Sequence, residues 1–432
     1  MKSKLIIGCM LLGAISANAQ VQPITAAEYK EKVLEYSRQI KQSSEERIAM
    51  QHAIKAAKTA FFPAVDFSGS YQYRINKYEL GMGEGIPGIE MDHNTYSLGA
   101  TVSQPIYAGG QIYNNYKAAE IQGQIATEAE ELTTDNIVYA ADMNYWSVAA
   151  RKGMYDVMTQ YVDIVQELAN VLTLRFQDGQ ISKTDLLQVQ ARLKEAELNK
   201  SSAYKDYQIA LQNLNVLMGV PPMEPITITD SITMVLPLPM KVGESAALEN
   251  RPDYLISKLN IEYQKRQINL SKAKYNPTLS VGFQGAWGTS MLNVKGSDNL
   301  WTPAVFASLK IPLFRWGARF KEVNSQKAIL RSKEYAMENT RDQISQEVAN
   351  AWTSLTENTK QIDVAEEACK IAEENLDLNT FSYNEGKLPI VDVLSAQLSW
   401  IQSYSSLIQT WYQQKASLAQ YNKAIGIRRM QF

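Results

Sequence analysis

The chain has 432 residues, a formal net charge of −2 and 45% hydrophobic residues. This near-neutral balance excludes the strongly positive surface that nucleic-acid binding requires, so no nucleic-acid partner is predicted. Two cysteines are present, Cys9 and Cys369. Because Cys9 lies in a segment that we expect to be removed, no intrachain disulfide is predicted.

Residues 1–19 have the features of a secretory signal peptide. Two lysines precede a mostly apolar stretch, and Ala17-Asn18-Ala19 fits a small-residue cleavage site. The apolar stretch is too short to span a bilayer as a helix. We therefore expect an exported chain that begins at Gln20, and a lipoprotein start at Cys9 is the alternative.

Motifs in the first half of the chain recur in the second half at a constant spacing. Pro105 and Pro312 are 207 positions apart, and so are Gly179 and Gly386. A constant spacing over most of a chain indicates internal duplication.

The spacing is 214 upstream, where Pro63 matches Pro277, and the longer spacing predicts an insertion in the glycine-rich loop 81–88. Each repeat is expected to hold a lead helix, a strand pair, a long helix and a return helix. The predicted organisation is a signal peptide at 1–19, a first repeat at 20–219, a linker with a short equatorial strand at 220–242, and a second repeat at 243–432.

Four segments alternate apolar and polar residues, which is the period of a β-strand. They lie near 65–76, 95–102, 279–288 and 301–311. An apolar face opposite a small, polar face is typical of a transmembrane β-barrel. For each strand taken alone, a soluble sheet packed on helices is the alternative.

The number of strands favours the barrel. No run of about 18 apolar residues follows residue 20, so a membrane-spanning part would have to be a barrel. Four strands cannot enclose a lumen, and open sheet edges are not tolerated in lipid. Three copies would close a 12-stranded barrel with a water-filled pore.

Two very long helices are predicted near 111–176 and 318–383, each on the order of 100 Å long. Such helices need partners along most of their length, and apolar residues spaced by three and four predict coiled-coil packing. An ordinary soluble coiled coil is the alternative. The predicted seams are Met158, Val162, Val165, Ala169, Leu172 and Phe176; Ile344, Val348, Ala351, Leu355, Ile362, Ala365, Cys369, Ala372 and Leu376; and, on the return helices, Leu186, Val189, Leu193, Val393, Ala396 and Ile401.

The sequence resembles the TolC-type outer-membrane efflux protein family. The resemblance is carried by Asn250-Arg251-Pro252-Asp253, by the two aromatic-x-x-Gly turns, by Val391-Asp392-Val393-Leu394 with Ala396 and Gln397, and by Pro105-Ile106-Tyr107 and Pro312-Leu313-Phe314. It implies an α+β membrane protein: a trimeric 12-stranded transmembrane β-barrel, four strands per chain, continued by a long periplasmic α-helical coiled-coil barrel.

The resemblance also implies a function and partners. The chain would be the outer-membrane exit duct of a tripartite efflux or type I secretion system, and would conduct substrates passively. Its partners would be two further copies of itself, a periplasmic membrane-fusion adaptor, an inner-membrane RND or ABC pump, and outer-membrane lipid. A periplasmic coiled-coil adaptor or a structural protein is the alternative.

Family resemblance implies a constriction at the periplasmic entrance, and Asp392 falls on one of its acidic ring positions. The second acidic position is Ser395 in this chain, so a single ring is expected. Three carboxylates around a narrow axis would favour cations. Without the resemblance, Asp392 reads as an acid that stabilises the first turn of its helix.

The hairpin turns are expected at the end of the helices far from the strands. Gly179 and Gly386 each follow a long helix, which is a helix-ending signal, and by resemblance they mark the tips that dock the adaptor. Asp185 and Tyr383 match a contact that holds neighbouring hairpins closed. The family's nearby arginine falls at Leu388, so a different latch is expected.

No catalytic, cofactor-binding or metal-binding motif is found. The two histidines, His52 and His93, are far apart and lack carboxylates at metal-ligand spacing. Phosphate-binding and nucleophile motifs are also absent. The chain is therefore predicted not to be an enzyme, and no cofactor is predicted.

Overall fold

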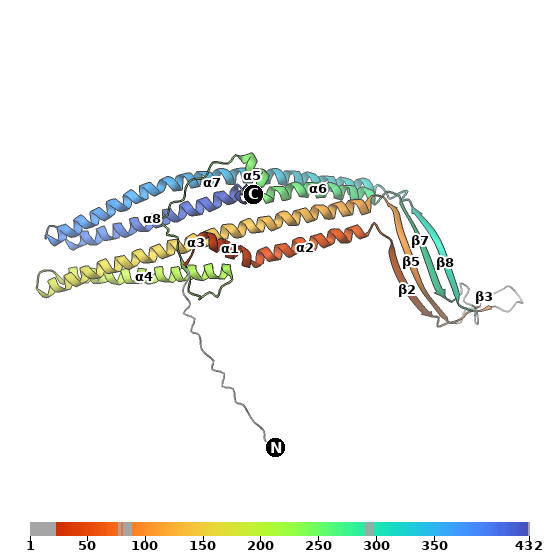
Figure 1. Cartoon of the computed structure of the whole chain (residues 1–432), viewed down its shortest axis with the longest axis horizontal. Helices are drawn as coiled ribbons and strands as arrows, with labels where there is room; N and C mark the ends of the chain where they lie inside the picture. Colours follow the sequence, from red (N-terminus) through yellow and green to blue (C-terminus); the bar gives the residue numbers. More distant parts are fainter. Residues whose placement is uncertain (1–22, 77–78, 81–88, 290–293, 295–297, 431–432) are drawn as a thin grey trace, which may run out of the picture. The chain divides into compact units, whose positions relative to one another are not determined.

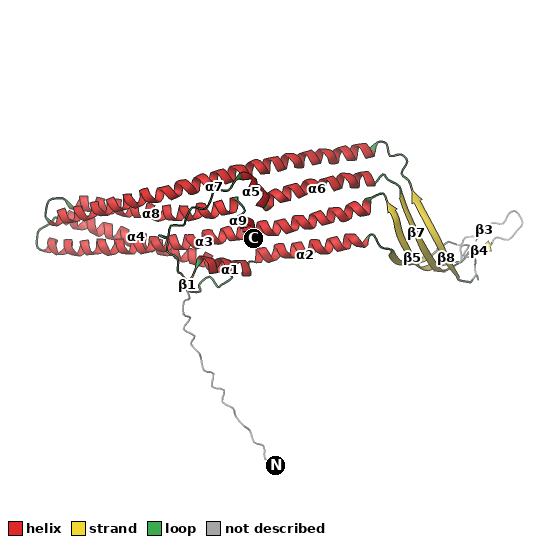
Figure 2. Cartoon of the chain, turned by 45° about the horizontal axis from the view of Figure 1, so that its top comes forward, coloured by secondary structure: helices red, strands yellow, loops and turns green. Residues whose placement is uncertain are grey.

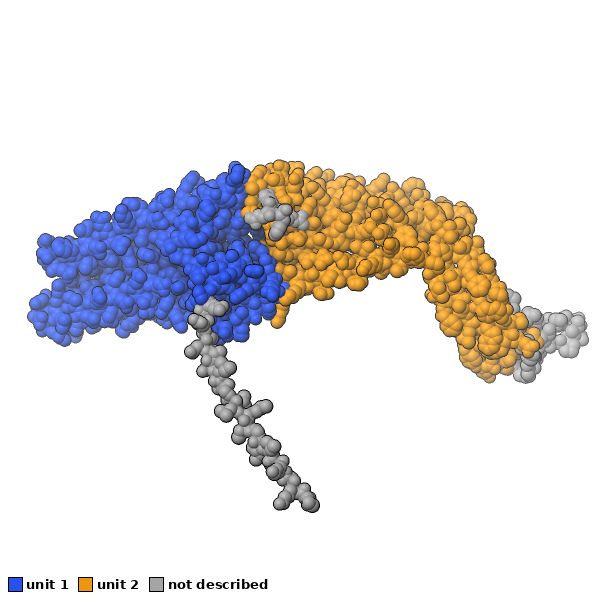
Figure 3. Space-filling view, in the orientation of Figure 1, with its two compact units in different colours: residues 1–37, 136–241, 349–423 blue, residues 38–135, 242–348, 424–432 orange. Residues whose placement is uncertain are grey.

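The computed structural model describes residues 23–76, 79–80, 89–289, 294 and 298–430. The predicted signal peptide and the loop 81–88 lie outside these residues. The chain is mostly helical and divides into two compact units, coloured separately in Figure 3. Unit 1 holds residues 1–37, 136–241 and 349–423, and unit 2 holds 38–135, 242–348 and 424–432. Each unit therefore takes residues from both predicted repeats.

Figure 1 shows the elements in chain order. The helices are α1 (Ala26–Tyr36), α2 (Arg38–Thr59), α3 (Gln111–Gln177), α4 (Lys183–Met218), α5 (Glu244–Asn250), α6 (Pro252–Ala273), α7 (Ala318–Asn384), α8 (Ile390–Ala424) and α9 (Ile427–Met430). The strands are β1 (Pro23–Ile24), β2 (Ala64–Tyr73), β3 (Glu79–Leu80), β4 (Ile89–Glu90), β5 (Asn94–Ala108), β6 (Thr227–Ile228), β7 (Thr278–Gly288) and β8 (Leu300–Lys310). The predicted long helices are confirmed, and each has 67 residues.

Unit 1 contains two helical hairpins, formed by residues 136–177 of α3 with α4 and by residues 349–384 of α7 with α8 (Figure 1). β1 pairs with β6 in parallel, so the predicted strand between the repeats is present. Among the described residues, no helix is both long and apolar enough to cross a membrane.

The coiled-coil seam of α7 is confirmed, while that of α3 is partly wrong. In α7, Leu355 is fully buried and Ala365 alone among the predicted positions is half-buried. In α3, Val157 and Tyr161 take the buried positions, whereas Met158 and Val162 are half-buried. The reason is a run of four-residue steps, which rotates the apolar stripe away from a strict seven-residue repeat. Phe176, one turn further, is 38% exposed.

Each predicted lead helix is interrupted, which is a second correction. α1 ends at Tyr36 and α2 begins at Arg38, while Ser37 has an extended ψ of 115°. In the second repeat the break falls at Arg251, because Pro252 has no N–H to donate and occupies the first turn of α6.

The linker 229–241 lies along α8 and is held by side chains of that helix. Lys415 Nζ donates to the Ile232 and Met234 carbonyls at 2.8 and 2.6 Å, and Gln414 Nε2 donates to the Leu236 carbonyl at 2.8 Å. The Tyr421 hydroxyl reaches the Met240 carbonyl at 3.4 Å. A turn closed by the bond from the Met234 amide to the Ser231 carbonyl, at 3.3 Å, brings the Ile232 and Met234 carbonyls to the same lysine.

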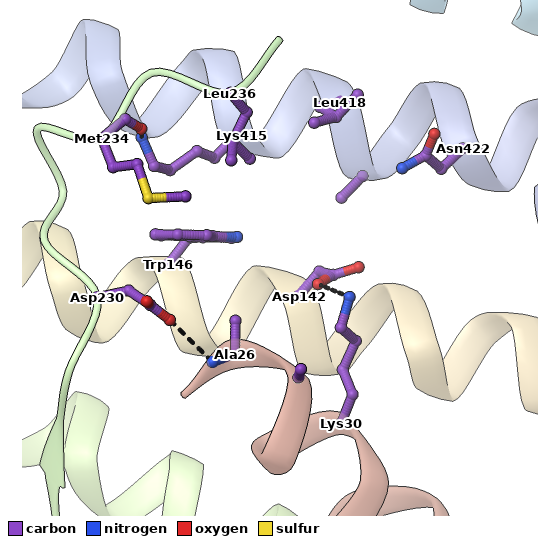
Figure 4. Close-up of a pocket in the computed structure, with 12 residues that line it drawn as sticks. Ala26, Lys30, Asp142, Trp146, Asp230, Met234, Leu236, Lys415, Leu418 and Asn422 are labelled. Atoms are coloured by element: carbon purple, nitrogen blue, oxygen red, sulfur yellow. Dashed lines mark hydrogen bonds and ion pairs between the residues drawn. The ribbon is translucent and has the colours of Figure 1, made fainter. Parts of the chain in front are cut away.

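Lys415 is a buried cation with no carboxylate partner among the described residues. Its side chain is 1% exposed, and Nζ lies 5.0 Å from the centre of the Trp146 ring. Figure 4 shows the lysine reaching toward Met234 above that ring. Burial lowers the pKa of Lys415 to about 8. Carbonyl dipoles and an aromatic face replace the water that the ammonium loses.

Unit 2 contains a four-stranded antiparallel sheet in the order β2-β5-β7-β8, at one end of its helices (Figure 2). Register places the apolar residues on one face, since Phe67 pairs with Ala100, and Val102 pairs with Phe283. The opposite face carries mostly small and polar residues, of which Ser68 and Gly99 form one pair, and Phe306, opposite Gly282, is an exception. The predicted alternation therefore holds across all four strands.

The apolar face of the sheet is exposed. Phe67, Tyr71 and Val305 are 75%, 68% and 83% exposed. β2 and β8 each pair along one side only within the described part of the chain. A soluble sheet would pack such a face against helices, so this arrangement does not fit the soluble alternative.

β5 runs through Pro105 to Ala108, beyond the end expected from the proline. Pro105 pairs with Ser280 and Tyr107 pairs with Leu279, so Ile106 forms a bulge. A bulge accommodates the missing N–H of proline within a paired strand.

The motif around Arg251 is structural in this chain. Its guanidinium bonds Asp253 at 2.6 Å, Glu347 at 3.0 Å and the Ala424 carbonyl at 3.3 Å. Arg251 is 7% exposed, so a buried charge is neutralised by two carboxylates.

The C-terminal end of α4 supplies a test of the packing. Gly219 has φ +78°, and a Cβ there would lie 2.1 Å from the Tyr36 ring. Gly179 has φ +70° and open space around its Cβ position. Both Ala substitutions strain the backbone, but only Gly219→Ala also creates a clash, so it should lower the free energy of unfolding by roughly 1–3 kcal/mol more. Thermal unfolding followed by circular dichroism measures both, and equal shifts would contradict this packing.

Lys415 gives a pH dependence. The unfolded side chain keeps its proton up to about pH 10.5, whereas the folded one loses it near pH 8. Between these values the unfolded state binds more protons, so stability rises with pH, by roughly 3 kcal/mol in all. The unfolding free energy of wild type minus that of Lys415→Met should be flat below pH 8 and rise above it. The control is Lys333→Met, which replaces an exposed lysine. If the difference in unfolding free energy from wild type has the same pH slope for both variants, the assignment is refuted.

Candidate functional site at the hairpin tips

The two hairpin tips are built alike. Gly179 and Gly386 have φ of +70° and +72°, and each follows the last turn of a long helix. At the first tip, the Gln180 and Gly179 amides donate to the Arg175 and Phe176 carbonyls, at 2.8 and 3.0 Å. Two such bonds around a left-handed glycine end a helix and reverse the chain. Open space surrounds both glycines.

Asp185 is engaged at the start of its own helix. Its backbone amide donates to Ser182 Oγ at 3.1 Å, and its carboxylate Oδ2 accepts from the Ser182 backbone amide at 3.3 Å. This reciprocal pair is a capping box, which satisfies donors at a helix N-terminus.

Asp392 occupies the equivalent position of the second tip, 207 residues on, in a different setting. The residue that corresponds to Ser182 is Pro389, which has no hydroxyl group. Asp392 donates its amide to the Pro389 carbonyl at 3.2 Å, and its half-buried carboxylate has no hydrogen-bond partner among the described residues. The serine-to-proline difference therefore leaves this carboxylate available.

Tyr383 packs against a residue that the sequence analysis missed. The Arg175 guanidinium lies 5.3 Å from the centre of the Tyr383 ring, and Arg175 Nη2 donates to Asn384 Oδ1 at 3.3 Å. Tyr383 is 8% exposed, whereas its counterpart Phe176 is 38% exposed. A cation over an aromatic face is attractive. These contacts join the tip of α3 to the tip of α7.

Asp185 and Tyr383 are not directly bonded within the described residues of one chain. No hydrogen bond joins the Tyr383 hydroxyl to the Asp185 carboxylate, which is held by Ser182. Leu388 provides no cation, and Arg175 reaches the tyrosine from the other hairpin instead. Nothing in local sequence spacing indicates that pair, because the two residues come from different repeats.

A second polar cluster in unit 1 lines a cavity of about 270 Å³ beside Lys415 (Figure 4). Asp230 accepts hydrogen bonds from the Ala26 amide at 2.9 Å and the Tyr145 hydroxyl at 2.7 Å, while Lys30 pairs with Asp142 at 3.0 Å. These groups satisfy one another, so the cluster fixes α1 and the linker. The signal that could have indicated this cluster is a lysine on the same helix face as the buried Trp411 and Ala419.

The described residues contain no group of histidine, cysteine and carboxylate side chains placed to hold a metal ion. Cys369 is buried, and burial raises the pKa of its thiol, so the thiolate form is disfavoured.

Comparison with known proteins identifies the family. A family model described as "Outer membrane efflux protein" matches residues 30–220 and 244–427. The chain is 22% identical to the outer membrane efflux protein BepC of Brucella suis, over 94% of this chain and 85% of that protein. It is 20% identical to the outer membrane protein TolC of Escherichia coli, over 90% of this chain and 79% of that protein.

Among solved structures, the Campylobacter jejuni CmeC outer membrane channel superimposes with a TM-score of 0.80 at 16% identity, over 93% of this chain and 85% of that one. This likeness shows a shared fold. The family and its structural neighbours are channel proteins, not enzymes, and the adaptor alternative has no support among these matches. The chain therefore belongs to the outer membrane efflux protein family, as an efflux channel of the outer membrane that extends into the periplasm.

Proposed function

We propose that three copies of this chain assemble into the exit duct of a tripartite efflux or type I secretion system. The observation that carries the assembly is the four-stranded sheet of unit 2, with its exposed apolar face and two open edges. Pairing β8 of one copy with β2 of the next would satisfy those edges and close a 12-stranded barrel. Lipid would cover the apolar face, and the small, polar face would line the pore.

The helices of the duct would form a coiled-coil barrel in the periplasm. α3 and α7 begin 207 residues apart and have equal lengths, which supports the proposed origin by duplication. In this proposal the repeats 20–219 and 243–432 each give two strands and one hairpin, and the linker 220–242 forms part of an equatorial belt. Family membership supports a periplasmic adaptor and an inner-membrane RND or ABC pump as partners.

The tips would form the entrance and the adaptor-docking surface. The open space around Gly179 and Gly386 supports docking, because a partner can approach the backbone closely there. No metal ion or cofactor is assigned to the chain, and cargo would pass without a chemical step.

Asp392 would form the constriction ring. Its unpartnered carboxylate, one in each of three copies, would place three negative charges around the axis. Such a ring concentrates cations and is blocked by multivalent ones. Asp185, at the equivalent position, is held by its capping box and would contribute less to the field at the axis.

Tyr383 would latch the hairpins in the closed state. Stacking of Arg175 on its ring joins α3 to α7, and the tyrosine hydroxyl would pair with Asp185 in the closed ring. Opening the entrance would require these contacts to separate.

The channel proposal is tested with purified protein in planar lipid bilayers, after native mass spectrometry has measured the mass of three chains. Asp392→Asn should raise the divalent-cation concentration for half-block of conductance at least about fivefold, since each charge contact is worth on the order of 1 kcal/mol. Asp363→Asn, an exposed acid on α7, is the matched control. Identical half-block concentrations in wild type and Asp392→Asn would exclude the ring, and a monomeric protein without conductance would exclude the duct.

The latch is tested by two substitutions that remove different atoms. Tyr383→Phe removes only the hydroxyl, and Arg175→Gln removes the cation over the ring together with the bond from Arg175 Nη2 to Asn384 Oδ1. Each should shift the closed–open balance about two- to fivefold toward open, because a single cation–aromatic or hydrogen-bonded contact contributes about 0.5–1 kcal/mol. Open probability in single-channel records measures this shift. Phe176→Leu at the other tip is the control, and closed-state occupancy that neither variant changes would refute the latch.

A further inference from the structure

The second strand-to-helix junction, between β8 and α7, exposes a group of large apolar side chains. Leu313, Phe314 and Trp316 are 90%, 71% and 90% exposed, and Phe320 in the first turn of α7 is 73% exposed. The Phe314 and Trp316 rings lie 5.0 Å apart and contact each other edge to face. Apolar groups gathered this densely on a surface indicate a binding site for another molecule or for a membrane.

The same junction is basic. Lys310, Arg315, Arg319 and Lys321 are all exposed, and residues 310–321 contain no acidic residue. The nearest acid in sequence is Glu322, which Lys274 Nζ and the Tyr275 hydroxyl bind at 3.4 and 3.0 Å. The Arg315 guanidinium lies 5.6 Å from the centre of the Tyr275 ring. The Glu322 carboxylate alone therefore does not neutralise the charge of Arg315.

The backbone at Trp316 is strained. Its φ is +49°, the one positive value among the described residues other than glycine. Gly109 holds the equivalent position of the first junction, with φ +64°, where a positive φ costs nothing. A bulky residue in this conformation is unfavourable, and beyond its contact with Phe314 a side chain that is 90% exposed gains little within the chain to offset the strain. A binding partner at this surface would supply the missing contacts.

The first junction serves as an internal comparison. Residues 103–114 correspond to 310–321, and they contain no charged residue and no tryptophan. The basic, aromatic surface is therefore a property of the second junction and does not follow from the shared strand-to-helix geometry.

We propose that this basic–aromatic junction, residues 310–321, binds the headgroups of anionic glycerophospholipids at the helix-side boundary of the membrane. The inference rests on the proposed function, which places the apolar sheet face in lipid. That face leads directly into the junction through Leu309 and Ile311, which are 62% and 50% exposed. The site is thus continuous with the surface that lipid would cover.

Each half of the junction suits one part of such a lipid. Tryptophan and phenylalanine prefer the boundary between headgroup and acyl chain, where an amphipathic ring meets both. Arginine and lysine bind phosphate oxygens, and arginine does so through two parallel hydrogen bonds. A basic residue near an anionic membrane surface is worth about fivefold in binding.

The fluorescence of Trp316 measures whether lipid surrounds its ring. The trimer is reconstituted into bilayers with lipids brominated along the acyl chain close to the headgroup, and tryptophan quenching is compared between wild type and variants. Trp316→Phe should remove a quenched component, as should Trp301→Phe on the apolar face. Trp411→Phe, which replaces a buried ring, should remove an unquenched one. A Trp316 component without quenching would overturn the proposal.

The headgroup preference is tested by charge removal. The triple variant Arg315→Gln, Arg319→Gln and Lys321→Gln should retain at least about tenfold less phosphatidylglycerol in native mass spectrometry. Retention of phosphatidylcholine should not change. The matched control is Lys327→Gln, Arg331→Gln and Lys333→Gln, three exposed charges further along α7. Equal phosphatidylglycerol retention by the two triple variants would overturn the proposal.

A neighbouring copy is the competing occupant, and the same samples distinguish it. If the junction packs against a second copy, the first triple variant or Trp316→Phe lowers the temperature at which trimers dissociate, and lipid retention stays as in wild type. That result overturns lipid binding. Trimer mass and conductance are recorded on each sample, so failure of the duct itself is recognised separately from failure of the lipid site.

Discussion

The need to pair every backbone N–H and carbonyl group constrains the rest of this structure. In water, the open edges of β2 and β8 would be solvated, and in hydrocarbon each unpaired N–H or carbonyl would cost several kcal/mol. In the proposed assembly, four strands with one apolar face from each copy would therefore form part of a larger closed sheet. The exposed side chains of Phe67 and Val305 lie on a surface that the single chain does not cover. The unpaired edges of the sheet are thus the structural reason for proposing assembly.

The helical part meets the same requirement differently. α3 and α7 satisfy their own backbone groups, so packing concerns only side chains and the irregular linker. The linker has few regular partners, and Lys415, Gln414 and Tyr421 supply bonds to its carbonyls instead. Burying the Lys415 ammonium group costs free energy, and its lowered pKa reflects that cost. The linker is thereby fixed to α8.

Much of the fold could be predicted from periodicity. Long helices, alternating strands and glycine turns depend on local chemistry, so Gln111 and Gly179 could be placed from the sequence alone. Seam assignments failed where local phase drifted, at Met158 and Val162, and where the helix approaches its end, at Phe176. No proline or glycine near Ser37 indicates the break between α1 and α2.

The candidate site was predictable only in part. Asp392 and Tyr383 could be located by resemblance, but their surroundings could not. The contact between Arg175 and Tyr383 joins two repeats, and no local pattern encodes a pair so far apart in sequence. The free carboxylate of Asp392 depends on a proline three residues earlier, which becomes informative once the two tips are compared.

The inequality of the two tips has a consequence for symmetry. In the proposed trimer, three copies would present six hairpins, and two identical repeats per chain would give the entrance sixfold symmetry. Phe176 is exposed where Tyr383 is buried, and Asp185 is capped where Asp392 is free, so the hairpins alternate between two kinds. A ring of six identical partner molecules would meet two distinct environments in turn, whereas a ring of three would meet one. The side chains that differ between the two repeats would thus influence how many partner molecules bind at the entrance.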